Sequence, residues 1–215
     1  MSLHYRHLLG RHTPARANRF TAALGGLALK ILGWRIIGTL PDTPKLLVVG
    51  APHTSNYDGV VALPAVLALD LKVSLMAKHS LFRGPLGPIM RWFGLIPVER
   101  HAAGGTVEAA IEQFAQHQKL WLGVAPEGTR SGVAQWKTGF HRIALAAQVP
   151  ILPVAWNYAE KAIVLGEPFM PGTDLEADLA RLYAFYRDKQ PRRPERLSAP
   201  LRQNNTAEAS DITKQ

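Results

Sequence analysis

A histidine and an aspartate, His53 and Asp58, stand five residues apart in the stretch APHTSNYDG. An aspartate that accepts the N–H of one imidazole nitrogen fixes the tautomer of the ring and stabilises the imidazolium that forms. The other ring nitrogen could then take a proton from a hydroxyl, which is general-base catalysis. The alternative is structural: Asp58 caps the following helix while His53 bonds to the turn. The pair alone leaves both interpretations open.

A second polar stretch, PEGTRS at residues 126–131, combines a turn sequence with charged groups. Pro-Glu-Gly favours a tight bend. Arg130 and, further along, Lys137 could bind an anion together with backbone N–H groups. A surface turn with solvated charges is the alternative interpretation.

Both stretches follow apolar runs that have the length of buried strands. Six such runs occur, at Leu46–Val49, Val73–Ala77, Leu95–Val98, Leu120–Ala125, Ile151–Trp156 and Ala162–Gly166. Helical patterns lie between or after them, at Gly59–Leu69, Leu81–Phe93, Thr106–Gln118, Thr138–Gln148 and Asp174–Arg187. This alternation predicts an α/β fold in which helices cover a sheet.

Ligands of open α/β sheets gather beyond the carboxyl ends of the strands. Polar groups follow four of the predicted strands: His53 and Asp58, then Lys78, then Arg100, then Glu127. We therefore expect a histidine, carboxylates and cations to converge on one edge of the sheet.

The residues that several common kinds of functional site require are missing from the sequence. The chain has no cysteine, which excludes disulfides, thiolate zinc sites and a cysteine nucleophile. G-x-S-x-G, H-E-x-x-H, Walker A and G-x-G-x-x-G are all missing from the sequence. We expect neither a metal nor a bound cofactor.

The net charge of +9 indicates a polyanionic neighbour: nucleic acid, an anionic membrane surface or a phosphorylated substrate. Residues 1–41 carry six Lys or Arg and no acid. In the same segment five apolar residues recur on one helical face, at Phe20, Leu24, Leu27, Ile31 and Trp34. Lys30 and Arg35 interrupt the run, so it predicts neither a membrane span nor a secretory signal.

Two interpretations of this segment remain, a core helix and an interfacial helix with its cations against anionic head groups. We expect three parts in the chain: a basic, amphipathic segment at 1–41, a folded domain at 42–188 and a polar, disordered tail at 189–215. No basic helix facing aromatic residues and no known nucleic-acid module occurs, so nucleic acid is not an expected partner.

Four blocks in order resemble the glycerolipid acyltransferases, the family of bacterial 1-acylglycerol-3-phosphate acyltransferase. They are HTSNYD, GLIPVER, PEGTRS and VPILPV, and the resemblance covers roughly residues 34–166. It implies an αβ sandwich with a mixed sheet covered by helices, plus an N-terminal amphipathic helix at a membrane interface. The implied activity is transfer of a fatty acyl group from acyl-CoA or acyl carrier protein to the hydroxyl of a lysophospholipid, without a covalent enzyme intermediate.

The resemblance also implies roles for individual residues. His53 is the general base and Asp58 orients it. The acceptor phosphate is bound by a basic pocket whose implied members are Arg100, Glu127, Gly128, Thr129, Arg130, Lys78 and Lys137. The implied location is peripheral, on the cytoplasmic face of the membrane.

Two positions depart from the better-known members of this family. Pro52 precedes His53 where Asn is frequent, and Ala125 stands where Phe is common. The acceptor therefore stays open between lysophosphatidate, another lysophospholipid and a lyso-aminolipid. Two other functions also stay open: a non-catalytic membrane-binding protein on the same frame, and a hydrolase that uses His53 to activate water.

Overall fold

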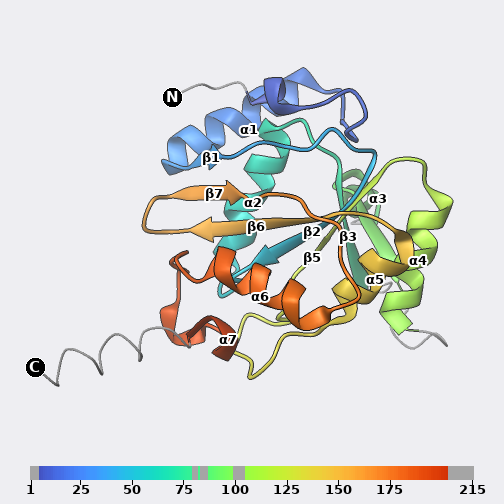
Figure 1. Cartoon of the computed structure of the whole chain (residues 1–215). Coiled ribbons are helices and arrows are strands. Elements are labelled where there is room, and N and C mark those ends of the chain that lie inside the picture. Colours follow the sequence, from blue (N-terminus) through green and yellow to red (C-terminus); the bar gives the residue numbers. More distant parts are fainter. Residues whose placement is uncertain (1–4, 79–81, 83–86, 99–104, 203–215) are drawn as a thin grey trace, which may run out of the picture.

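A seven-stranded mixed sheet forms the centre of the computed structural model, which describes residues 5–78, 82, 87–98 and 105–202. Its strand order is β1-β7-β6-β2-β5-β3-β4 (Figure 1). The strands are β1 (Arg35–Ile37), β2 (Lys45–Ala51), β3 (Val73–Lys78), β4 (Leu95–Val98), β5 (Leu120–Val124), β6 (Ile151–Asn157) and β7 (Ala162–Leu165). Strands β6, β2, β5, β3 and β4 are parallel, whereas β7 is antiparallel to β6 and parallel to β1.

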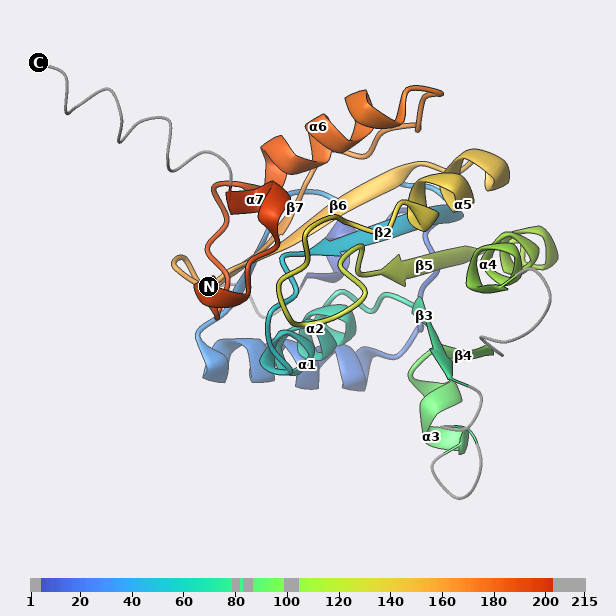
Figure 2. The same ribbon diagram turned by 90° about the horizontal axis from the view of Figure 1, so that it is seen from below.

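Helices cover both faces of this sheet, which makes an α/β/α sandwich (Figures 1 and 2). On one face lie α1 (Arg19–Leu32) and α2 (Tyr57–Ala68), over a core that includes Leu29, Leu46 and Trp121. On the other lie α5 (Gly139–Ala147), α6 (Leu175–Tyr186) and α7 (Ala199–Arg202) together with α4 (Gly105–Gln116), over a core around Leu47, Leu122 and Phe140. Helix α3 (Gly87–Trp92) lies beside β4. Short 3-10 turns at Arg6–Leu8 and Pro194–Arg196 complete the elements.

The six predicted strands and the predicted helices are present, with ends that differ by at most two residues for all but one. The exception is the predicted helix at Leu81–Phe93, where the described part, α3, begins only at Gly87. Strand β1 was not predicted, because its residues continue the apolar run of the N-terminal helix. Gly33 ends that helix in the left-handed conformation, with a φ of 73°. The chain then turns, and Trp34 becomes buried, so its placement on the helical face was wrong.

Helix α1 packs on α2 through its smallest residues. Ala22, Gly25, Gly26 and Leu29 are buried. A Cβ at Gly25 would lie 2.5 Å from the backbone nitrogen of Ala68, so the two backbones are in close contact. The large apolar side chains consequently point outward: Phe20 is 77% exposed, Leu24 52%, Leu27 47% and Ile31 76%. The helix therefore combines a core-facing side of small residues with an apolar outer side.

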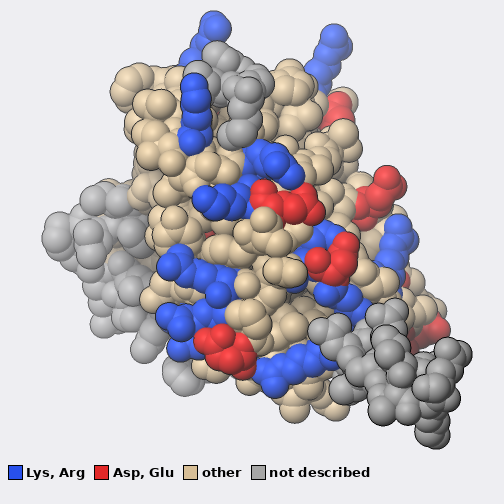
Figure 3. Space-filling view, turned by 90° about the vertical axis from the view of Figure 1, so that its left-hand side faces the viewer, with Lys and Arg blue, Asp and Glu red and all other residues tan. Residues whose placement is uncertain are grey.

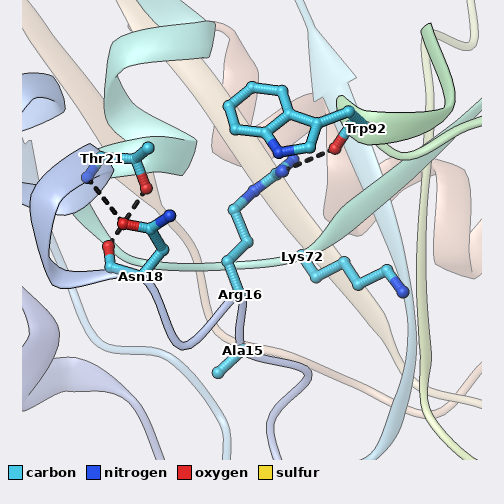
Figure 4. Close-up of a pocket in the computed structure, with 6 residues that line it drawn as sticks. All are labelled: Ala15, Arg16, Asn18, Thr21, Lys72 and Trp92. Atoms are coloured by element: carbon cyan, nitrogen blue, oxygen red, sulfur yellow. Dashed lines mark hydrogen bonds between the residues drawn. The ribbon is translucent and has the colours of Figure 1, made fainter. Parts of the chain in front are cut away.

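The chain before α1 is tied to the edge of the sheet at the amino end of β3. Buried Asp70 forms an ion pair with Arg6, at 2.9 Å, and accepts a hydrogen bond from the backbone N–H of Asn18. The guanidinium of Arg16 donates to the carbonyls of Leu71, Trp92 and Phe93. A cavity of about 250 Å³ lies here (Figure 4), lined by Ala15, Arg16, Asn18, Thr21, Lys72 and Trp92.

The expectation of a disordered tail from residue 189 onward was wrong for residues 189–202. Ser198 and Leu201 are buried, at 0% and 4% exposure. The backbone N–H of Ala199 donates to the carbonyl of Val133 at 2.8 Å. Polar groups of this segment are thus satisfied by the domain itself, which lets a polar sequence pack. Residues 203–215 lie outside the described part.

No helix in the described part of the chain has both the length and the apolar character to cross a membrane.

Candidate active site

The predicted pair lies at the carboxyl edge of the sheet, with His53 in the loop between β2 and α2 and Asp58 in the first turn of α2. Nδ1 of His53 lies 2.9 Å from Oδ2 of Asp58. The imidazole is 25% exposed and packs near the ring of Trp156, whereas the carboxyl of Asp58 is wholly buried. The structure therefore brings His53 and Asp58 together and leaves one side of the imidazole accessible.

Asp58 is surrounded by hydrogen-bond donors. Its Oδ2 also accepts from the backbone N–H groups of Thr54 and Ser55, each at 2.9 Å, and its Oδ1 accepts from the Tyr158 hydroxyl at 2.6 Å. Burial alone would raise the pKa of Asp58, but the hydrogen bonds from His53, Tyr158 and Ser55 outweigh it and lower the pKa. Asp58 is therefore ionised. Asp58 both bonds to the backbone of the turn and holds the imidazole. The structural role and the orienting role, which the sequence left as alternatives, therefore occur together.

The ionised carboxylate decides the tautomer of His53. A carboxylate can only accept hydrogen bonds, so Nδ1 carries the proton and Nε2 is left with its lone pair. This is the arrangement that a general base requires.

Tyr158, directly after β6, was not predicted from the sequence. Burial, and then the neighbouring charge of Asp58, raise its pKa, so it stays a protonated donor. The available signal was its position just beyond the end of a parallel strand, at the edge where ligands gather.

Glu127 lies behind the histidine. Its Oε2 accepts from the backbone N–H of His53 at 2.7 Å, and its Oε1 accepts from the Ser198 hydroxyl at 3.3 Å. The residue is 3% exposed, and this burial raises its pKa to about 7. Both of its oxygens therefore bond to the protein, so the structure supports a role in holding the loop that carries His53 more directly than a role in shaping an acceptor pocket.

The cations of the PEGTRS turn are exposed beside Glu127. Gly128 has a φ of 64°, and its N–H donates to the carbonyl of Ala125. Lys137 lies across this turn, because a Cβ at Gly128 would be 3.1 Å from its Nζ. Thr129 and Arg130 are also exposed. Among the described residues, no carboxylate forms an ion pair with Arg130 or Lys137, so both can bind an anion.

The two other predicted cations are less well placed. Lys78 ends β3, in register with Val98 of β4, but its side chain lies outside the described part. Arg100 also lies outside it. Their roles stay predictions.

The acyltransferase family model matches residues 35–157, which include the loop between β2 and α2, the PEGTRS turn and strand β6. The chain belongs to the acyltransferase family. The 1-acyl-sn-glycerol-3-phosphate acyltransferase of Escherichia coli K12 is 35% identical over 123 residues, which is 54% of this chain and 48% of that one. The human 1-acyl-sn-glycerol-3-phosphate acyltransferase beta is 28% identical over 110 residues, or 48% of this chain and 40% of that one. The chain thus spans about half the length of the curated relatives that it matches.

A solved structure shares the fold of this acyltransferase family member. The crystal structure of the 1-acyl-sn-glycerophosphate acyltransferase PlsC from Thermotoga maritima aligns with a TM-score of 0.57 at 20% identity. The alignment covers 81% of each chain. The α/β fold expected from the sequence is therefore confirmed.

The C-terminal segment lies beyond the range matched by the family model, yet it reaches the loop that carries His53. The backbone N–H of Arg193 donates to the hydroxyl of Thr54, and the guanidinium of Arg192 lies 3.9 Å over the ring of Tyr57. Both arginines belong to the segment 189–215, which was expected to be a disordered tail. Figure 3 looks onto the carboxyl edge of the sheet. Basic side chains are spread over this face, with acidic ones between them.

Glu127→Gln tests the buried carboxyl. The pKa of Glu127 is about 7, against 4.5 for a solvated glutamate, so between these values the folded protein binds a proton that the unfolded chain has lost. Stability therefore falls as the pH rises through this window. Because Gln does not titrate, the stability of the wild type relative to Glu127→Gln should fall by about 2–3 kcal/mol between pH 5 and pH 8. Urea unfolding at both pH values measures this.

Glu167→Gln is the matched control, because this carboxylate is exposed and forms no ion pair within the described ranges of the chain. An equally small difference between pH 5 and pH 8 for both variants would contradict the assignment.

Proposed function

We propose that this protein is an O-acyltransferase that moves a fatty acyl group from an acyl thioester to the hydroxyl of a lysophospholipid such as 1-acylglycerol-3-phosphate. The observation that carries the proposal is the His53–Asp58 pair, with Nε2 free and the imidazole accessible at the carboxyl edge of β2. The names of the Escherichia coli and human relatives supply the acceptor class.

The proposed reaction uses His53 twice. The acceptor hydroxyl gives its proton to Nε2 while its oxygen forms a bond to the thioester carbonyl carbon. The imidazolium that results is stabilised by the buried charge of Asp58. When the tetrahedral intermediate collapses, the C–S bond breaks and the leaving thiolate takes the proton back from Nε2. The thioester of acyl-CoA or acyl carrier protein is already activated, so no covalent enzyme intermediate is needed.

We further propose that Arg130 and Lys137 bind the acceptor phosphate. Both are exposed and unpaired among the described residues, and their turn follows β5, the strand next to β2. Charge-assisted hydrogen bonds from two cations suit a phosphate dianion. Lys78 and Arg100 are proposed as further members of the same basic site.

The acceptor and product are lipids, so the active site must work at a membrane surface. Phe20, Leu24, Leu27 and Ile31 form an apolar outer side on α1, and Val60 and Leu63 of α2 are also exposed. Helix α2 begins at Tyr57, next to Asp58, so this apolar surface reaches the catalytic loop. We propose that these two helices seat the protein peripherally on the cytoplasmic face of an anionic membrane, with the cations of α1 near the head groups.

His53→Ala is the first test. Removing the base should lower transfer by about 10²- to 10⁴-fold, because general-base catalysis typically supplies that factor. The assay offers labelled acyl-CoA and acyl carrier protein against a panel of lysolipids, with a no-acceptor control that detects hydrolysis. His117→Ala, at an exposed histidine directly after α4 whose Nδ1 lies 2.9 Å from the carbonyl of Gln113, should keep full activity. Retained transfer by a folded His53→Ala protein would refute the base assignment.

Arg130→Ala tests the phosphate site. Losing a charge-assisted contact should raise the apparent KM for a phosphorylated acceptor at least tenfold, since such bonds are worth about 1.5–3 kcal/mol. The apparent KM for the acyl donor should stay the same. Arg142→Ala removes another exposed arginine, on α5, and should change neither value. An equal rise for donor and acceptor would argue against phosphate binding by Arg130.

The double variant Phe20→Ser/Ile31→Ser tests the membrane face. Each large apolar side chain buried from water is worth about 1.5–3 kcal/mol, so partitioning onto anionic vesicles should fall at least tenfold. Vesicle co-sedimentation measures this. The control Leu145→Ser/Met170→Ser changes two exposed apolar residues elsewhere, and should bind as the wild type does. Equal losses in both double variants would contradict the proposed membrane face.

A further inference from the structure

The segment 189–202, here named the C-terminal strap, lies outside the range matched by the family model but contacts three loops of the active site. Its Gln190 carbonyl accepts from the backbone N–H of Tyr158 at 2.8 Å. Its Arg193 N–H donates to Thr54, and its Ala199 N–H donates to Val133 beyond the PEGTRS turn. The strap thus bonds to the loop before α2, to the loop after β6 and to the loop after β5.

Ser198 is the strap residue that reaches the catalytic machinery itself. It is wholly buried, and its hydroxyl accepts from Nε1 of Trp136 at 3.0 Å. An indole N–H can only donate, so the serine oxygen is the acceptor in that bond. The hydrogen of the serine hydroxyl is therefore available for Oε1 of Glu127, which lies 3.3 Å away.

Glu127, held by Ser198, also bonds to the histidine. Its other oxygen accepts from the backbone N–H of His53 at 2.7 Å. The base is consequently held from two sides, at its ring by Asp58 and at its backbone by Glu127. The position of the Glu127 carboxyl is in turn fixed by Ser198 and the indole of Trp136.

We propose that Ser198 is a positioning residue of the acyltransferase centre, acting through Glu127 on the backbone of His53. The inference rests on the proposed function. It makes the C-terminal strap part of the active site, so a fragment that ends at the limit of the family match would lack a component of the catalytic centre.

The consequence for the protonation of Glu127 distinguishes this role from simple packing. A hydrogen bond donated to a carboxylate favours its charged form. Loss of the Ser198 hydroxyl should therefore favour protonated Glu127, which is a weaker acceptor for the His53 N–H. The ionisable groups that surround Glu127 are His53 and Asp58 of the catalytic loop, Tyr186 of α6 and Lys137 of the adjoining turn, and the variant leaves all of them in place.

The test compares Ser198→Ala with Ser198→Thr, which keeps a hydroxyl. The acid limb of kcat/KM, with long-chain acyl-CoA and 1-acylglycerol-3-phosphate as substrates, should move up by about one pH unit in Ser198→Ala. At pH 7 the loss should be about 5- to 10-fold, and it should shrink at pH 9. Ser198→Thr should restore the wild-type profile.

Leu201→Ala is the matched control, because it removes a buried apolar side chain of the same strap without touching Glu127. It should lower the melting temperature and leave the pH profile unchanged. If Ser198→Ala behaves in the same way, with a lower melting temperature and an unshifted profile, the positioning role is overturned.

A second readout does not depend on activity. Carbon-13 NMR of labelled glutamate carboxyls follows the titration of Glu127, with Glu127→Gln assigning its signal. The midpoint should lie about one pH unit higher in Ser198→Ala than in the wild type. An unchanged midpoint refutes the link between Ser198 and Glu127. If the midpoint shifts in Ser198→Ala but the wild-type protein transfers no acyl group to any acceptor, the proposed function is refuted instead.

Discussion

Asp58 holds a negative charge at a position where its side chain does not reach solvent. An isolated buried carboxylate would be very costly, so the fold must supply donors from several places at once. Two come from the backbone of its own loop, one from the imidazole, and one from Tyr158, a hundred residues later in the chain. The conformation of the loop between β2 and α2, and the orientation of His53, follow from satisfying this one charge.

In the neighbouring carboxyl of Glu127, the effect of burial on the pKa outweighs the effect of hydrogen bonds. It is nearly as buried but has fewer donors, and burial raises its pKa to about 7 while hydrogen bonds lower the pKa of Asp58. Pairs of carboxyls whose surroundings push their pKa values apart are typical of catalytic sites. Here Asp58 keeps its charge against the imidazole, whereas Glu127 bonds to the backbone of His53 and has a pKa of about 7.

Hydrophobic periodicity and residue spacing predicted most of the sheet and the His53–Asp58 pair, because both are local signals. Tyr158 and Ser198 could not be found in that way, since their partners lie 100 and 71 residues away and only the folded chain brings them together. The strap was misjudged because its composition is polar, and composition does not reveal that its polar groups meet buried partners. In α1 four of the five residues predicted for the apolar face lie in the helix and are exposed, whereas Trp34 lies beyond its end and is buried. Which side faces the core was decided by Gly25, whose small size allows close backbone contact.

That close contact between α1 and α2 has a kinetic consequence. Because small residues take most of the inner side, the large ones are left for the proposed membrane contact, and an enzyme seated in this way would meet its acceptor in two dimensions. Its turnover would then follow the mole fraction of acceptor in the lipid surface rather than the bulk concentration. Adding inert phospholipid at constant total acceptor would dilute the substrate and slow the reaction.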